Sequence, residues 1–201
     1  MDGEGELIYS KDDIFPPVSY NGNFKDGKRS GKGKLVLKNG KTYEGDFKND
    51  CYNGFGVYTF SKKDEIDLFK GHGKDGEKSG EGKFVWKSGA NYEGDFENDL
   101  RNGFGVLTYP NEDARDFYAG LWKDGRRSGK GKLVSKDGEQ YEGDFENDLC
   151  NGFGVYTYSK ESTNDCYEGH WKDGKKSGKG KLVSKDGTKQ EGIFENGFFK
   201  H

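Results

Sequence analysis

The sequence predicts an all-β fold: an elongated, twisted, single antiparallel β-meander of hairpins in series. One phrase occurs twice with two changes, as YEGDFENDLRNGFGVLTY at 92–109 and YEGDFENDLCNGFGVYTY at 141–158. Apolar and polar residues alternate within each copy, which is typical of strands. Only 29% of residues are hydrophobic, whereas 15% are aromatic and 34 residues are glycine. This composition favours a thin, ring-lined sheet over a thick aliphatic core.

The phrase belongs to a longer series of repeated units. Units begin at residues 20, 43, 69, 92, 118, 141, 167 and 190, with spacings that alternate between 23 and 26 residues. A short-type unit and a long-type unit thus form a pair that recurs every 49 residues, which indicates a repeat architecture. We assign residues 1–201 to one array, with a half unit at 1–19 and a partial unit at 190–201.

Each unit is predicted to be a hairpin, with two short strands around a polar turn. Strict alternation in the first long-type unit pairs three couples of residues: Tyr43 with Tyr58, Gly45 with Gly56, and Phe47 with Gly54. Glycines that face one another leave room for rings from adjoining strands and let the sheet twist.

The connection between a short-type and a long-type unit is predicted to be a three-residue loop, with Gly40 in the left-handed region. This loop pairs Leu35 with Tyr43. It also pairs opposite charges across the strands: Lys34 with Glu44, Lys32 with Asp46, Lys132 with Glu142, and Lys130 with Asp144. One equivalent pair breaks the rule, because Glu81 is placed opposite Asp95.

The repeated pattern of an aromatic residue, glycine, a second aromatic residue and then two glycines resembles the MORN repeat (membrane occupation and recognition nexus). One copy is carried by Tyr92, Gly94, Phe96, Gly103 and Gly105. The departures are Gly73, which stands where an aromatic residue is expected, and Gln190 at the first position of its unit. The resemblance implies a curved antiparallel sheet that positions other components in cytoskeletal, ciliary or flagellar assemblies. The family name records a proposed membrane role.

Several other function classes find no support in the sequence. The net charge of −3 gives no overall attraction to nucleic acid, and no stretch is apolar enough to span a membrane. The start of the chain lacks the pattern of a signal peptide, and the three cysteines are scattered, which favours reduced cytosolic thiols. The segment KDGKRSGKGK at 25–34 has the wrong glycine spacing for a phosphate-binding loop. The three histidines form no metal-ligand pattern. We therefore expect no cofactor, no metal and no enzymatic activity.

Basic residues recur in the turns of the short-type units and form a candidate edge for an anionic partner: Lys28, Arg29, Arg126, Arg127, Lys175 and Lys176. Such a row could meet anionic lipid head groups or an acidic protein surface. The alternative is solvated charge balanced by neighbouring carboxylates. The long-type turns carry Asp50, Asp99 and Asp148, so the sign of the charge alternates along this edge.

Aromatic residues form the second candidate surface. Alternation turns Phe55, Phe104 and Phe153 away from the face on which rings meet glycines. On that face they could contact a partner protein, or they could pack against the aliphatic part of neighbouring lysine side chains. The ring-lined face is the other candidate groove. The full set of candidate partner-binding residues is Phe55, Phe104, Phe153, Tyr58, Tyr109, Trp122 and Trp171.

The sequence and the resemblance together predict a non-enzymatic scaffold that docks protein partners in a cytoskeletal, ciliary or flagellar (axonemal) assembly of the cytoplasm. One alternative is a peripheral membrane module that binds anionic phospholipids through its Lys/Arg edge. Another is a regulatory repeat domain of a larger enzyme. The last strand pattern, QEGIFENGFF at 190–199, carries little charge to repel a second strand, so we also expect end-to-end self-association.

Overall fold

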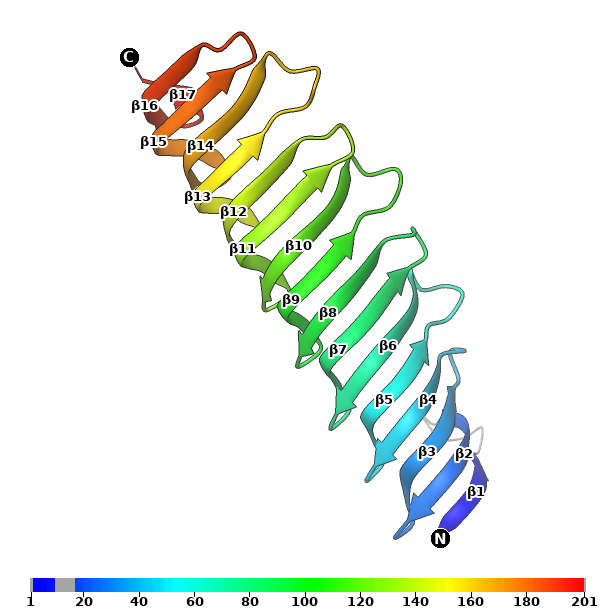
Figure 1. Ribbon diagram of the computed structural model, residues 1–201. Coiled ribbons are helices and arrows are strands. Elements are labelled where there is room, and N and C mark those ends of the chain that lie inside the picture. Colours follow the sequence, from blue (N-terminus) through cyan, green and yellow to red (C-terminus); the bar gives the residue numbers. More distant parts are fainter. Residues whose placement is uncertain (1, 10–16, 201) are drawn as a thin grey trace. The chain divides into compact units, whose positions relative to one another are not determined.

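The structure, a computed structural model, describes residues 2–9 and 17–200 (Figure 1). These residues form β-strands joined by turns, and no helix occurs among them. Accordingly, no described helix has the length and apolarity needed to cross a membrane. The predicted half unit at 1–19 lies partly outside the described ranges.

Residue contacts divide the chain into two compact units, Met1–Leu100 and Arg101–His201. The first contains β1 (Gly3–Ile8), β2 (Pro17–Lys25), β3 (Lys28–Leu37), β4 (Thr42–Lys48), β5 (Cys51–Thr59), β6 (Ile66–Lys74), β7 (Glu77–Trp86) and β8 (Asn91–Glu97). The second contains nearly all of β9 (Leu100–Thr108), followed by β10 (Arg115–Lys123), β11 (Arg126–Ser135), β12 (Gln140–Glu146), β13 (Leu149–Thr157), β14 (Asn164–Lys172), β15 (Lys175–Ser184), β16 (Lys189–Glu195) and β17 (Phe198–Phe199).

Within each unit, every strand pairs antiparallel with the strands before and after it in the chain. This is the predicted meander of serial hairpins, and the all-β fold class is confirmed. The connecting loop is also as predicted. Leu35 pairs with Tyr43, Gly40 has a φ of 81°, and the Leu37 N–H donates to the Lys41 carbonyl across the three intervening residues.

The predicted register within the hairpins is confirmed near the paired glycines and wrong next to the turn. Gly45 faces Gly56 and Tyr43 faces Tyr58, as predicted, but Phe47 faces Tyr52 rather than Gly54. A β-bulge separates the two parts of the ladder. The same shift occurs in the short-type hairpins, and the bulged strand carries a glycine in the left-handed region in both cases, Gly31 and Gly54. In this hairpin the Asp46 carboxylate also accepts a hydrogen bond from the Phe55 N–H at 3.1 Å. Strict alternation assumes one residue opposite one residue and therefore misses a bulge.

Glycine is required where the ladder of this hairpin tightens. A Cβ atom on Gly45 would lie 2.5 Å from the Cα atom of Gly56 and 2.6 Å from the Tyr43 hydroxyl. At the bulge, Gly54 has a φ of 99°, and its Cβ atom would lie 2.9 Å from that of Asp46. A side chain at either position would collide with the backbone or with the adjoining residue.

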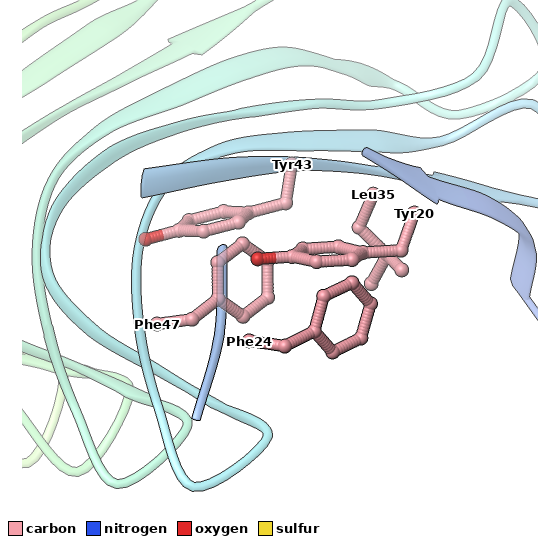
Figure 2. Packing of buried hydrophobic residues seen from close by; sticks show 5 residues of the cluster. All are labelled: Tyr20, Phe24, Leu35, Tyr43 and Phe47. Carbon is pink, nitrogen blue, oxygen red and sulfur yellow. The ribbon is translucent and has the colours of Figure 1, made fainter. Parts of the chain in front are cut away.

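Rings take the space that these glycines leave. Figure 2 shows the first cluster, in which Tyr20, Phe24, Leu35, Tyr43 and Phe47 pack inside the bend of the strands. The ring of Phe47 stands edge-on between those of Tyr20 and Tyr43, with both pairs of centroids 5.1 Å apart. Edge-to-face pairs of this kind add about 0.5–1.5 kcal/mol each beyond area burial. Because such pairs recur along the chain, few aliphatic residues are needed.

Six tyrosines at the first position of their units share one hydrogen bond. Each hydroxyl donates to the backbone carbonyl three residues later, at the bulge, with distances of 2.9–3.1 Å; the donors are Tyr20, Tyr43, Tyr92, Tyr118, Tyr141 and Tyr167. The bulge takes this carbonyl out of the regular ladder, and the phenol supplies a donor for it. Phe69 is the short-type exception, because it carries no hydroxyl.

Candidate interaction surfaces

In each compact unit, the rings at the first and fifth positions of the repeats define a surface, which we call the inner face. The buried side chains of this face are Tyr20, Phe24, Tyr43, Phe47, Phe69, Tyr92, Phe96, Tyr118, Trp122, Tyr141, Phe145, Tyr167, Trp171 and Phe194. Residues that alternate with them point to the opposite surface, the outer face.

Two of the predicted partner-binding residues, Trp122 and Trp171, are part of the packed inner face. Trp122 is only 4% exposed, and its indole N–H donates to the Gly105 carbonyl at 3.2 Å. Trp171 makes the same bond to the Gly154 carbonyl at 3.3 Å. The guanidinium of Arg101 lies 4.1 Å from the ring centroid of Trp122. These indoles build the inner face and leave little free surface of their own.

Tyr58 and Tyr109 lie half-buried at the margin of the inner face. The Tyr58 ring packs against Phe60 at 4.8 Å, and the Arg115 guanidinium covers the Tyr109 ring at 4.0 Å. The structure therefore places them beside the inner rings but does not join them to the outer phenylalanines.

The outer face presents the three predicted phenylalanines. Phe55, Phe104 and Phe153 are 41%, 57% and 44% exposed. Each is partly supported by neighbours: the Phe55 ring lies 5.4 Å from that of His72, with the Lys70 ammonium 5.8 Å from its centroid. Roughly half of each side chain remains available for contact.

Shallow grooves run beside these phenylalanines over the paired glycines. In the first unit, one groove of about 720 Å³ is bordered by Phe55, Lys32, Lys34 and Glu44 and has Gly33 in its floor. In the second unit, a groove of about 470 Å³ runs between Phe104 and Phe153. The charged residues that line the grooves are Lys32, Lys34 and Glu44 in the first unit and Lys130, Lys132 and Glu142 in the second. All of them belong to the predicted cross-strand pairs: Lys32–Asp46 at 2.9 Å, Lys34–Glu44 at 3.3 Å, Lys130–Asp144 at 2.8 Å and Lys132–Glu142 at 3.7 Å. The grooves thus combine apolar contact with balanced charge.

Two of the six residues of the candidate cationic edge, Arg29 and Arg127, are bonded to a neighbouring turn. The Arg29 side chain donates to the Asp50 carboxylate at 3.1 Å and to its carbonyl at 2.9 Å. Arg127 makes the same two bonds to Asp148, at 3.2 and 2.6 Å. Although partial burial alone would raise the pKa of Asp50, the hydrogen bonds from Arg29 hold it below its ordinary value.

The remaining residues of the edge are divided. Lys176 lies 5.1 Å from the Tyr167 ring centroid and 5.2 Å from that of Tyr158, and burial lowers its pKa. Lys28, Arg126 and Lys175 are exposed at the turns. The structure therefore leaves one outward cation at each of three turns rather than a double row.

A cavity of about 270 Å³ opens on the inner face of the first unit. It is lined by five rings and by the turn between β6 and β7: Tyr43, Tyr52, Tyr58, Phe60, Phe69, Gly71, Gly73, Gly76, Glu77, Lys78 and Asp99. Of this set, the sequence marked only Tyr58 as a candidate. The departure at Gly73 was the available signal, but the sequence does not show which rings from other strands would surround the vacancy.

Titratable groups in the inner face are held in their neutral forms. Burial raises the pKa of Tyr43 to about 12, with a further contribution from the Asp46 charge, and burial raises the pKa of Tyr118 to about 12. Burial likewise raises the pKa of the Cys150 thiol to about 11, so it stays protonated at neutral pH. Among residues 2–9 and 17–200, no three His, Cys, Asp or Glu side chains are grouped to hold a metal ion.

Comparison with known families identifies the repeats. The family model described as MORN repeat matches seven consecutive segments, at residues 20–42, 43–65, 69–90, 92–114, 118–140, 141–163 and 167–189. Together these segments span well over half of the chain. No curated protein matches the chain.

Proposed function

The chain belongs to the MORN-repeat family, whose repeats are interaction modules for proteins or membranes, and we propose that it is a scaffold that docks protein partners. The observation that carries the proposal is the recurrence of Phe55, Phe104 and Phe153 at one position, each about half exposed beside a groove with charged walls. Aromatic side chains surrounded by balanced charge are typical of protein interfaces.

The charge distribution favours a protein partner over an anionic membrane. Arg29 and Arg127 are paired with carboxylates, and the net charge of the chain is −3. Polybasic membrane binding gains about 1 kcal/mol per cation near the surface, and it depends on cations that are free to approach the lipid. Lys28, Arg126 and Lys175 are too few for strong retention.

A capture experiment tests the docking proposal. The full chain is immobilised beside a variant with Phe55→Thr, Phe104→Thr and Phe153→Thr, and proteins retained from the native cell extract are quantified by mass spectrometry. The matched control carries Leu100→Thr and Leu149→Thr, which change exposed apolar residues at the turns. A set of proteins retained by the wild type and the control but lost from the variant is expected. Equal retention by all three chains contradicts docking at the phenylalanines.

A vesicle experiment tests the membrane alternative. The full chain is sedimented with vesicles that contain phosphatidylserine and a phosphoinositide at physiological salt. We expect it to stay in the supernatant. If the wild type co-sediments and a triple variant with Lys28→Ser, Arg126→Ser and Lys175→Ser does not, the proposal is contradicted and the peripheral membrane function is favoured.

We further propose a cytoskeletal, ciliary or flagellar setting, which is supported only by the settings in which MORN repeats occur. Imaging of the tagged chain in detergent-extracted cells of its native source tests this. The scaffold setting predicts that the chain stays with the extracted cytoskeleton or axoneme, and complete release with the soluble fraction contradicts it.

End-to-end self-association is proposed through the final strands. β17 pairs with β16 only near Phe194 and Glu195, and Phe198 is 77% exposed. A strand edge that is only partly covered can pair with another chain. Light scattering should show a mass that rises with concentration, and a constant monomer mass contradicts this proposal.

A further inference from the structure

The unit that begins at Phe69 differs from the other short-type units at its fifth position. Gly73 stands there, where the equivalent residues are Phe24, Trp122 and Trp171. All three of those rings are buried in the inner face. Among the four short-type repeats, only the one that begins at Phe69 therefore lacks a ring at the fifth position.

The backbone does not require glycine at this position. A Cβ atom on Gly73 would meet its nearest neighbours at 3.5 and 3.6 Å, which is ordinary van der Waals contact, and its φ lies outside the left-handed region. Gly71 differs, since its Cβ atom would lie 2.6 Å from the Cα atom of Gly82. Gly73 thus serves no conformational purpose that a larger residue could not serve.

Tyr52 occupies part of the space that the missing ring leaves. Its ring lies 4.1 Å from that of Tyr43 and 6.1 Å from that of Tyr58. Trp171 makes the equivalent contacts in the second unit, at 5.2 Å to Tyr141 and 6.0 Å to Tyr156. Even with Tyr52 in this place, a cavity of about 270 Å³ remains between the rings and the β6–β7 turn.

The charge at the rim of the cavity is also specific to this unit. Glu77 lines the cavity and is exposed, whereas the equivalent positions carry Lys28, Arg126 and Lys175. The two other charged rim residues, Lys78 and Asp99, neutralise each other in an ion pair of 2.5 Å. The rim therefore has a net negative charge where the other short-type turns are positive.

We propose that this cavity receives one aromatic side chain from a partner protein, with a basic residue of that partner beside Glu77. This inference rests on the proposed docking function and adds the chemistry of the partner. The chain itself shows that a phenyl or indole ring is accommodated at this position, since Phe24, Trp122 and Trp171 are packed there in the other units. A cavity near 150 Å³ already binds benzene in another protein, so about 270 Å³ is enough for an indole. Charge complementarity at the rim would set the orientation of the segment.

Binding of 5-fluoroindole to the full chain, followed by fluorine NMR, tests the cavity. Wild type and Gly73→Ala should bind saturably, because one methyl group leaves most of the cavity open. Two filled variants should bind about tenfold more weakly or not at all. One is Gly73→Leu. The other is Tyr52→Arg with Gly73→Trp, which recreates the Arg101–Trp122 pair of the second unit. Circular dichroism establishes that each variant is folded.

The two filled variants differ at residue 52, so a loss common to both traces to the cavity and not to the Tyr52 wall. Equal binding by wild type and both filled variants overturns the proposal, as does the absence of saturable binding to wild type. Tighter binding of tetramethylammonium than of fluoroindole also overturns it, because that result identifies a cage for a cation.

The rim is tested with two peptides, N-acetyl-Trp-Arg-amide and N-acetyl-Trp-Glu-amide. At low salt the wild type should bind the arginine peptide several-fold more tightly, and Glu77→Lys should remove or reverse the preference. Equal affinity of both peptides for wild type overturns the role of Glu77. These probes are independent of any cellular partner, so the cavity can fail while protein capture by the outer phenylalanines succeeds, or the reverse.

Discussion

Gly143 and Gly154 face each other across β12 and β13 so closely that a Cβ atom on Gly143 would lie 2.5 Å from the Cα atom of Gly154. The nearest side-chain atom is the Tyr141 hydroxyl, which would be 2.7 Å away. The same close approach recurs at Gly22–Gly33 and Gly45–Gly56 in the first unit and at Gly120–Gly131 and Gly169–Gly180 in the second. The close contact of two glycine backbones is therefore a repeated geometric element of this fold.

Gly143→Ala is expected to lower the free energy of unfolding by about 2 kcal/mol or more, because the methyl group must displace backbone or the Tyr141 ring. Urea denaturation followed by circular dichroism measures this. Gly73→Ala is the matched control, since its Cβ contacts are ordinary, and it should change stability by less than about 1 kcal/mol. Equal effects of the two substitutions would contradict the steric account.

Tyr141→Phe should lower the free energy of unfolding by about 1–2 kcal/mol, because the Asp144 carbonyl at the bulge loses its donor. The ring and its packing are unchanged, so the effect isolates the hydroxyl. The reciprocal change, Phe69→Tyr, supplies a donor in the one short-type unit that lacks it and should leave stability unchanged or raised. If Tyr141→Phe leaves the free energy of unfolding in urea unchanged, this hydrogen bond does not stabilise the bulge.

Arg127→Ala should destabilise the second unit by about 2 kcal/mol, since the side chain bonds Asp148 and packs on two rings. Arg126→Ala removes the same charge from the adjacent, exposed position and should cost less than about 0.5 kcal/mol. Thermal denaturation compares the pair. If both variants lose the same amount of stability, Arg127 contributes only through its charge.

Alkaline pH should unfold the protein through its buried phenols. Burial raises the pKa of Tyr43, Tyr118 and Tyr167 to about 12, from an ordinary value of 10.0. Above the ordinary value the unfolded chain loses phenolic protons while the native chain keeps them, so stability falls as pH rises. We expect full stability up to about pH 10 and a progressive loss toward pH 12.

The absorbance of tyrosinate and the circular dichroism of the strands should therefore change together in this window. Tyr118→Phe should make the decline shallower, after correction for its lower starting stability. Ionisation of all tyrosines well before the strands are lost would contradict the burial account.

The sequence predicts the meander, the Leu35–Tyr43 register and the Lys130–Asp144 pair because each depends on alternation along adjoining strands. The bulge opposite Asp46 is not predictable in the same way, since it puts extra residues on one strand and so breaks the one-to-one pairing that alternation assumes. The glycine at the bulge, Gly54, stands among many other glycines, and the spacing does not single it out.

The candidate site divides along the same line. Exposure of Phe55, Phe104 and Phe153 follows from alternation alone. Alternation does not predict that the Tyr52 ring on β5 occupies part of the space left by Gly73 on β6. Which ring fills such a space depends on three-dimensional packing. The ion pair of Arg29 with Asp50 likewise joins the turns of two successive hairpins. The sequence pattern shows a row of cations and a row of carboxylates but not that they bond to each other.

The bonds between successive turns have a direction. In the second unit, the Asp148 N–H donates to the Arg127 carbonyl, the Gly174 N–H to the Cys150 carbonyl, and the Gly197 N–H to the Lys176 carbonyl. Each of these turns is hydrogen-bonded to the turn before it. When the second unit is pulled from residue 200, we therefore expect its hairpins to detach one at a time, because each turn is held by a bond to the turn before it.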